Sequence, residues 1–342
     1  MAAENPVATQ PSPDRAPGVR FDHLTKRYPR PGQEPTVAVE DVNLSVEPGS
    51  LTVLVGSSGS GKTTLLRSVN RMVTPTSGRV LIDGRDTAEL DPVKLRRTIG
   101  YVMQESGLLP HRRVIDNIAT VPRLNGVKKA PAQAHARELM HLVGLDPQLA
   151  ARYPAELSGG QQQRVGVARA LAANPKLLLM DEPFGAVDPI VRADLQREIR
   201  ELQRKLGITI LFVTHDIAEA LALGDHIVVL AEKGRIEQQG TSTELIAHPA
   251  NDFVANFLGV DATLALQLRE TGGAQLVLDQ QGRPVGRVAQ TGRTTDPAAP
   301  RSSADQPDHA SKYPEKSAAS PRRASADHPE TNPARRSDGR PS

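Results

Sequence analysis

One stretch of the chain, "GSSGSGKTT", has the residue types and spacing of a phosphate-binding loop. It matches the pattern G-x-x-x-x-G-K-[ST], in which glycines let the backbone approach a phosphate and successive N–H groups favour the anion. We expect Lys62 to reach the β- and γ-phosphates of a nucleotide and the Thr63 hydroxyl to ligate Mg²⁺. The residues predicted to bind the nucleotide are Gly56, Ser57, Ser58, Gly59, Ser60, Gly61, Lys62, Thr63 and Thr64.

Two adjacent acids end an apolar run further along the chain, "LLLMDEP" at Leu177–Pro183. We expect Asp181 to hold the Mg²⁺ shell and Glu182 to polarise the attacking water as a general base. Alone, the pattern is equally typical of a carboxylate that caps a helix after a strand. The phosphate loop in the same chain favours the catalytic interpretation.

Three further side chains are weaker candidates for the same site. His215 ends the run "ITILFVTH", which places it at the carboxyl edge of a sheet, where it would contact the γ-phosphate. Gln104 in "YVMQES" is a candidate for sensing Mg²⁺ and the attacking water, and Tyr28 in "LTKRYP" for stacking on adenine. Each also has a structural alternative: a buried histidine, a loop glutamine and a packed tyrosine.

The stretch "LSGGQQQR", Leu157–Arg164, has polar donors but no base, metal ligand or partnered nucleophile. Ser158 offers a hydroxyl, Gly159 and Gly160 offer bare N–H groups, and the residues that follow predict a helix N-terminus. Together these features favour the binding of an anion, but the stretch does not form an enclosed anion site by itself. The alternative is a flexible polar linker.

Alternating strand and helix signals must position these groups between about Val19 and Gly259. Helical spacing of apolar residues in Val191–Leu206 predicts an amphipathic helix. Strands that alternate with helices predict an α/β fold with parallel strands. Buried strands are predicted at Thr52–Val55, Leu177–Met180, Ile208–Val213 and Ile227–Leu230.

The composition changes at both ends of this region. Residues 1–18 are rich in Pro and Ala and predict a loose arm, whereas 260–289 predict a small extension with one β-hairpin near Gly282. Residues 290–342 contain hardly any large apolar side chain and are expected to be a disordered tail. Its arginines could alternatively anchor it on acidic lipid, but interleaved acids weaken that reading.

Charge and cysteine content narrow the class of protein. The net charge is +3 among 342 residues, which does not argue for nucleic acid, and there is no Cys for disulfide or thiol chemistry. The first residues lack a signal-peptide pattern, and no apolar run approaches the roughly 20 residues of a spanning helix. We therefore expect a soluble, cytoplasmic protein whose membrane role depends on a partner.

The motifs occur in an order that resembles the ATP-binding subunit of ABC transporters: "GSSGSGKTT", Gln104, "LSGGQQQR", "LLLMDEP", "GAVD" and "VTHD". The resemblance covers about 19–259. It implies an α/β P-loop NTPase fold of the ABC type with a helical subdomain, and ATP and Mg²⁺ as cofactors. It further implies that Ser158, Gly159, Gly160 and Gln161 close on the ATP of a second ATPase subunit, and that Asp188 couples the two sites.

Several longer stretches resemble the ATPases of importers for glycine betaine, choline and carnitine: "DPVKLRRTIGYVMQESGLLPH", "RYPAELSGGQQQRVGVARALAANP", "MDEPFGAVDPIVR" and "HPANDFVANFLG". The resemblance implies a transmembrane permease, contacted at about 105–124, an extracytoplasmic substrate-binding protein, no nucleic acid, and a place on the cytoplasmic face of the membrane. Many such ATPases continue into paired CBS domains, of which 260–289 resemble at most a fragment. The scarcity of aromatic residues argues against a quaternary-ammonium site in this chain.

Two other functions remain open. The same cassette could drive an importer for amino acids, methionine or alkyl-sulfonates, because the solute never touches these residues. A soluble ABC ATPase acting on ribosomes or DNA is the second alternative. The single cassette and the lack of long coiled coils weigh against it.

Overall fold

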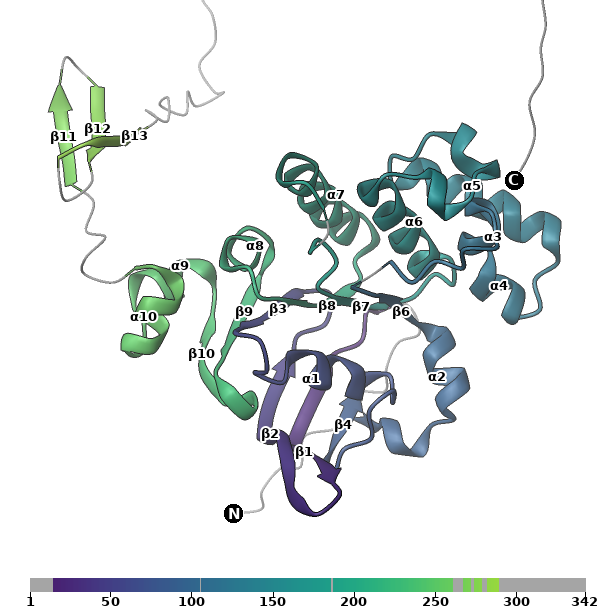
Figure 1. The fold of residues 1–342 in the computed structure, drawn as a ribbon, viewed down its shortest axis with the longest axis horizontal. Helices are drawn as coiled ribbons and strands as arrows, with labels where there is room; N and C mark the ends of the chain where they lie inside the picture. Colours follow the sequence, from purple (N-terminus) through teal and green to yellow (C-terminus); the bar gives the residue numbers. More distant parts are fainter. Residues whose placement is uncertain are drawn as a thin grey trace, which may run out of the picture. The chain divides into compact units, whose positions relative to one another are not determined.

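The computed structural model describes residues 15–104, 106–185, 187–260, 267–271, 274–278 and 282–288. A six-stranded sheet forms the centre of the cassette, in the order β10-β9-β3-β8-β7-β6 (Figure 1). All neighbours in it run parallel except β10, which is antiparallel to β9. The predicted buried strands are confirmed as β3, β7, β8 and β9. The bounds are β3 Leu51–Gly56, β6 Ile99–Val102, β7 Leu177–Asp181, β8 Thr209–Thr214, β9 His226–Leu230 and β10 Ile236–Gly240.

A second, four-stranded sheet has the order β2-β1-β4-β5, and its pairs are antiparallel. Helix α1 (Lys62–Val69) lies between the two sheets, where Leu65, Leu66 and Val69 are buried with apolar side chains of both (Figure 1). The phosphate loop is thus fixed at both ends, by a central strand before it and a buried helix after it. The strand bounds are β1 Val19–Arg30, β2 Gln33–Val46, β4 Ser77–Ile82 and β5 Arg85–Asp86.

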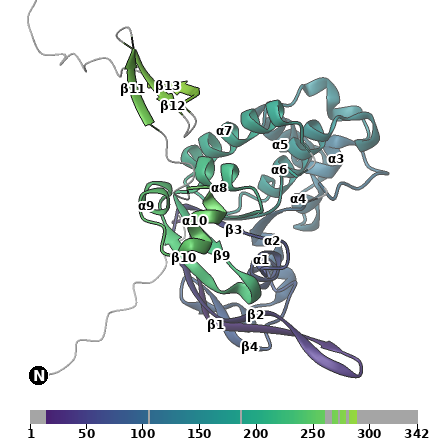
Figure 2. The same cartoon turned by 60° about the vertical axis from the view of Figure 1, so that its left-hand side comes forward.

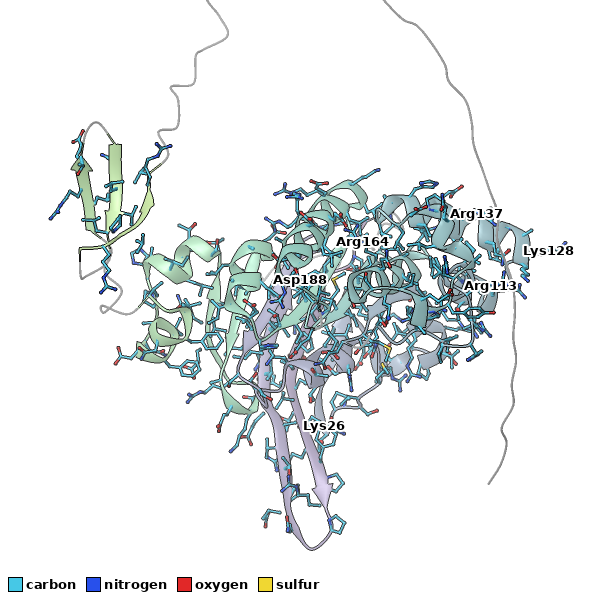
Figure 3. All side chains as sticks on the ribbon, turned by 45° about the horizontal axis from the view of Figure 1, so that its top comes forward. Lys26, Arg113, Lys128, Arg137, Arg164 and Asp188 are labelled. Carbon is cyan, nitrogen blue, oxygen red and sulfur yellow. The ribbon has the colours of Figure 1, made fainter. Side chains whose placement is uncertain are left out.

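Helices cover the other face of the central sheet and form the second apolar core (Figure 2). The expected helical subdomain consists of α3 to α6, whose outer end carries Arg113, Lys128 and Arg137 (Figure 3). The amphipathic helix predicted at 191–206 is confirmed within α7. The bounds are α3 Val114–Ile118, α4 Thr120–Leu124, α5 Lys129–Leu142, η2 Pro147–Ala151, η3 Pro154–Glu156, α6 Gly159–Leu171, α7 Pro189–Leu206 and α8 Ile217–Leu223.

The remaining short helices flank the sheets. They are η1 Thr87–Glu89, α2 Pro92–Thr98, η4 Glu232–Gly234, α9 Ser242–Ala247 and α10 Asp252–Leu258. In the part of the chain that the structure describes, no helix has the length and apolar character needed to cross a membrane.

The end of the predicted N-terminal arm is packed against the cassette. Ala16 is buried, the Pro17 carbonyl accepts a hydrogen bond from Thr209 Oγ1 at 2.7 Å, and the Gly18 N–H donates to Asp83 Oδ1 at 2.8 Å. The expectation of a loose arm is therefore wrong for 16–18, because long-range partners that local composition does not reveal fix the backbone. Residues 1–14 lie outside the described part.

A small antiparallel sheet is formed after residue 260 by β11 (Gln267–Thr271), β12 (Ala274–Leu278) and β13 (Pro284–Arg287). The predicted hairpin is confirmed in the pairing of β12 with β13, and Gly282 has the positive φ of a turn, 75°. Strand β11 was not predicted. The interpretation as a CBS-like fragment stays a prediction, and the predicted tail, 290–342, lies outside the described residues.

Candidate nucleotide site

The phosphate loop joins β3 to α1, and two of its glycines have backbones that only glycine adopts readily. Gly59 and Gly61 have φ values of 82° and 94°, and a Cβ on Gly61 would lie 2.4 Å from Val39 Cγ1. The loop closes around Lys62, which is 4% exposed and donates to the Gly56 and Ser57 carbonyls at 2.8 Å each. Burial lowers the pKa of Lys62, while the nearby carboxylates Glu182 and Asp181 oppose that shift. The loop thus presents a cation at its centre.

A cavity of about 630 Å³ opens beside this loop. It collects residues from five separate parts of the sequence: the β2 edge, the loop with α1, Gln104, the end of β7 and the end of β8. Six of the nine predicted phosphate-loop residues and all three predicted catalytic residues line it. The lining residues are Thr36, Val37, Ala38, Ser58, Gly59, Gly61, Lys62, Thr63, Thr64, Gln104, Glu182 and His215.

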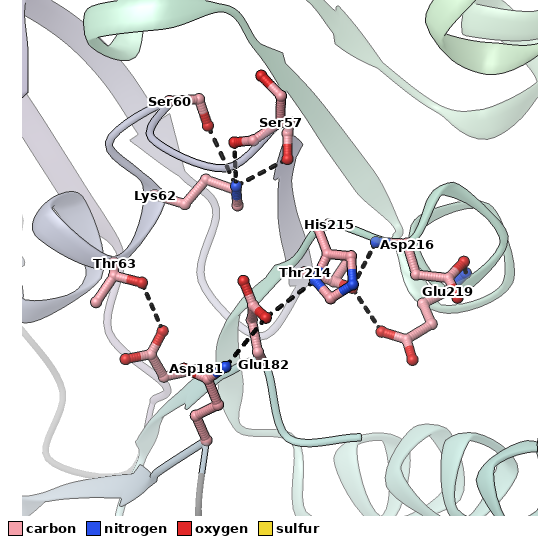
Figure 4. A network of polar contacts seen from close by, with 12 residues as sticks. Ser57, Ser60, Lys62, Thr63, Asp181, Glu182, Thr214, His215, Asp216 and Glu219 are labelled. Carbon is pink, nitrogen blue, oxygen red and sulfur yellow. Dashed lines mark hydrogen bonds and ion pairs between the residues drawn. The ribbon is translucent and has the colours of Figure 1, made fainter. Parts of the chain in front are cut away.

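Glu182 is the centre of a polar cluster in this cavity (Figure 4). Its Oε2 lies 2.9 Å from His215 Nδ1 and 3.5 Å from Gln104 Nε2. Its backbone is left-handed, with φ 44°, and its N–H donates to the Val213 carbonyl at 3.0 Å. A non-glycine residue in this region is strained, and such strain concentrates at functional sites. The backbone therefore turns at the strand end, so that the carboxylate faces the cavity.

Asp181, one residue earlier, is 1% exposed and faces α1 instead. Its Oδ1 accepts a hydrogen bond from Thr63 Oγ1 at 2.9 Å. A buried carboxylate, a hydroxyl and the nearby Gln104 amide suit Mg²⁺, which takes few protein ligands and completes its shell with phosphate and water. Among the described residues there is no group of three or more His, Cys, Asp or Glu placed to hold a metal alone.

Two residues that the sequence interpretation missed contact Asp181 Oδ2. The Tyr101 hydroxyl donates to it at 3.0 Å, and Arg67 Nη2 lies 3.2 Å away. Burial, followed by the nearby Asp181 charge, raises the pKa of Tyr101 to about 12. The spacing of Arg67, four residues after Thr63 on a helix, was the available signal, because i and i+4 share a face.

Tyr28 stands beside the cavity without lining it. It is 40% exposed in β1, where it pairs with Thr36, and Thr36 lines the cavity. Lys26 Nζ lies 5.0 Å from the centre of its ring. The adenine contact stays a prediction.

The "LSGGQQQR" motif begins α6 and lies outside the cavity. Ser158 caps the helix: its Oγ accepts from the Gln161 N–H at 3.3 Å, and its own N–H donates to Gln161 Oε1 at 3.0 Å. Gly159 and Gly160 form the first turn. The motif is therefore a structured helix start, and the alternative of a flexible linker is wrong. In this arrangement the Gln161 side chain is engaged in the cap.

Asp188 lies immediately before α7, and a neighbouring arginine that sequence reasoning missed connects its segment to the His215 turn. Arg192 Nη2 donates to the Val187 carbonyl at 3.2 Å, and Nη1 donates to Asp216 Oδ2 at 3.1 Å. Nothing in the motif spacing indicates this contact, because one partner, Val187, precedes α7 and the other, Asp216, follows β8.

The fold and the cavity define a P-loop ATPase cassette. A family model described as ABC transporter matches residues 39–185. The osmoprotectant import ATP-binding protein of Salmonella typhimurium is 50% identical over 264 residues, covering 77% of this chain and 68% of that protein. The glycine betaine uptake system ATP-binding protein of Escherichia coli is 49% identical, covering 70% of this chain and 76% of that protein. The chain belongs to the ABC transporter ATP-binding family, and it is an ABC ATPase.

Other relatives extend beyond the matched region. The carnitine transport ATP-binding protein of Listeria monocytogenes is 47% identical over 76% of this chain, but the match spans only 64% of its own length. Among solved structures, a bacterial ABC transporter cassette in dimeric form is 33% identical, with a TM-score of 0.60, over 66% of this chain and 98% of that chain. A post-hydrolysis form of that cassette, bound to ADP and phosphate, has a TM-score of 0.59.

Proposed function

We propose that this chain is the ATP-hydrolysing subunit of an importer for osmoprotectants of the glycine betaine, choline and carnitine type. The convergence of Lys62, Gln104, Glu182 and His215 on one cavity carries the ATPase part of the proposal. The assignment of the solute rests on relatives named for osmoprotectant import and glycine betaine uptake, at 50% and 49% identity. Importers of amino acids, methionine or alkyl-sulfonates remain the alternative.

In the proposed reaction, water attacks the γ-phosphorus of ATP, and the bond from that phosphorus to the ADP oxygen breaks. Glu182 accepts the proton of the water, while His215 orients the Glu182 carboxylate and contacts the γ-phosphate. Lys62 and the loop N–H groups hold the β- and γ-phosphates. Thr63, Asp181 and Gln104 would hold Mg²⁺, which when bound neutralises developing phosphate charge.

A second copy of the chain completes the site in this proposal. The N-terminus of α6 offers the Ser158 hydroxyl and the bare N–H groups of Gly159 and Gly160, yet none of them lines the cavity of its own chain. A partner facing head to tail would bring this helix end to the γ-phosphate. The similarity to a cassette solved as a dimer supports this arrangement, with Asp188 in the segment between the two sites.

The permease is proposed to dock on a groove of the helical subdomain, which is lined mainly by the predicted 105–124 contact segment. The groove has a volume of about 630 Å³, and its charged side chains are mostly basic. Leu124 and Tyr153 are exposed apolar surface on it. A permease loop that carries carboxylates and an apolar side chain fits this chemistry and would place the ATPase on the cytoplasmic face of the membrane. The ionisable lining residues are His111, Arg112, Arg113, Asp116, Arg123 and Lys129.

Uptake of labelled glycine betaine and choline at high salt tests the proposal. A deletion strain that lacks redundant carriers is complemented with wild type or with Glu182→Gln. We expect uptake to fall on deletion and only wild type to restore it. Unchanged uptake in the deletion strain would move the assignment to another solute, and full rescue by Glu182→Gln would contradict the role of Glu182.

A further inference from the structure

Three side chains hold the two oxygens of the buried Asp181 carboxylate. Thr63 Oγ1 meets Oδ1 at 2.9 Å, whereas the Tyr101 hydroxyl and Arg67 Nη2 meet Oδ2 at 3.0 and 3.2 Å. Each oxygen therefore has its own set of donors. A carboxylate held in this way has one orientation.

The direction of the hydrogen bonds around Oδ2 is determined by chemistry. Arg67 Nε can only donate, and it lies 3.2 Å from the Tyr101 hydroxyl oxygen. Asp181, as a carboxylate, can only accept. The Tyr101 proton must therefore point at Oδ2, and Arg67 donates to both the phenol oxygen and the carboxylate. The three side chains form a closed network of hydrogen bonds.

These groups come from α1, β6 and the end of β7, and their contacts fix the positions of these three elements relative to one another. Tyr101 comes from β6, which runs parallel to β7 and pairs Tyr101 with Leu179, two residues before Asp181. Arg67 and Thr63 come from α1, four residues apart on one face. One helix thus holds Oδ1 and Oδ2 at once. Arg67 also provides the opposite charge that a carboxylate 1% exposed requires.

We propose that Tyr101 and Arg67 are positioning residues for the divalent cation of the ATPase, an inference that rests on the proposed function. They occupy Oδ2, so that only Oδ1, beside the Thr63 hydroxyl, addresses the metal shell. Loss of either contact frees the carboxylate to rotate and weakens the cation site. Groups that orient a metal ligand from behind typically contribute about 10- to 100-fold to metal affinity.

Equilibrium binding of Mn²⁺, a paramagnetic substitute for Mg²⁺, measures this directly. Electron paramagnetic resonance counts free Mn²⁺ in titrations of the full chain with a non-hydrolysable ATP analogue. Tyr101→Phe and Arg67→Gln should raise the Mn²⁺ dissociation constant about tenfold. Arg137→Gln is the matched control for Arg67→Gln, because this arginine is exposed on α5 and lies outside the cavity. It should leave the constant unchanged.

A second measurement separates positioning from general damage to the fold. The Mg²⁺ concentration for half-maximal ATPase activity should rise about tenfold in Tyr101→Phe, whereas turnover at saturating Mg²⁺ should change far less. An unchanged Mn²⁺ constant in Tyr101→Phe overturns the inference, whatever Arg67→Gln does. If wild type itself fails to bind Mn²⁺ with the analogue, the proposed ATPase site is what fails.

Discussion

The left-handed backbone of Glu182 predicts an unusual order of stability among its variants. With φ 44°, this residue holds a conformation that costs an L-amino acid about 1 to 2 kcal/mol relative to glycine. Glu182→Ala keeps that strain and Glu182→Gly releases it. Both variants lose the 2.9 Å contact with His215 and the approach of Gln104, so these losses cancel when the two are compared.

The expected difference follows from two opposing contributions. Release of strain favours glycine by about 1 to 2 kcal/mol, and the larger entropy of the unfolded glycine chain opposes it by about 0.4 to 1 kcal/mol. Glu182→Gly should therefore be more stable than Glu182→Ala by about 1 kcal/mol. The matched control is Glu138, an exposed residue within α5, where Ala should instead be more stable than Gly by about 1 kcal/mol.

Urea unfolding of the nucleotide-free chain measures all four free energies, and ATPase assays on the same samples measure the chemistry. Turnover should fall by about 100-fold or more in Glu182→Gly, Glu182→Ala and the isosteric Glu182→Gln, because each lacks the proposed general base. If Glu182→Ala proves more stable than Glu182→Gly, the argument from a strained backbone is refuted. Turnover within about tenfold of wild type in Glu182→Gln would refute the general base.

Three further expectations concern neighbouring parts of the cassette. Gly61→Ala should cost about 3 kcal/mol or more in urea unfolding, because its Cβ would lie 2.4 Å from Val39 Cγ1, whereas Gly126→Ala, with φ 88° and open space, should cost about 1 kcal/mol. Arg192→Gln should lower turnover about tenfold, the worth of one charge-assisted hydrogen bond, with nucleotide affinity in calorimetry unchanged. Burial raises the pKa of Glu219 above 4.5 in the folded protein. The free energy of unfolding of the wild type should therefore fall as pH rises from the unfolded-state pKa to the folded-state pKa of this group. Glu219→Gln lacks this loss and should become more stable relative to the wild type over the same pH range in urea unfolding.

The parts of the fold that the sequence predicted are those with a strong local signal. Strands β3, β7, β8 and β9 are continuous apolar runs, because both faces of the central sheet are covered and no alternation is required. The order of the motifs along the chain then indicated which strand ends meet. Glu182, His215 and Gln104 were expected at one site, and the structure places them within one cavity.

The parts that were missed depend on contacts between distant residues. Strands β1 and β2 pair with several register shifts, and such bulges interrupt the alternation by which a strand is recognised. In the sequence, Tyr101 looks like any tyrosine packed in a strand. Its role becomes visible only in the fold, which places its hydroxyl beside Asp181, 80 positions later. Ala16 to Gly18 looked like the rest of a Pro-rich arm, since the partners that order them lie far along the chain.

Arginine links the motifs to one another in this cassette. Arg67 joins the phosphate-loop helix to Asp181, and Arg192 joins the segment of Asp188 to the turn after His215. Arg169 of α6 donates to the Ser106 and Gly107 carbonyls at 2.7 and 2.6 Å, just after Gln104. A planar guanidinium can hold two acceptors in fixed directions, which the point charge of lysine cannot do. Arg169 therefore fixes the segment after Gln104 to α6, whose N-terminus carries the glycines proposed to meet the partner's ATP.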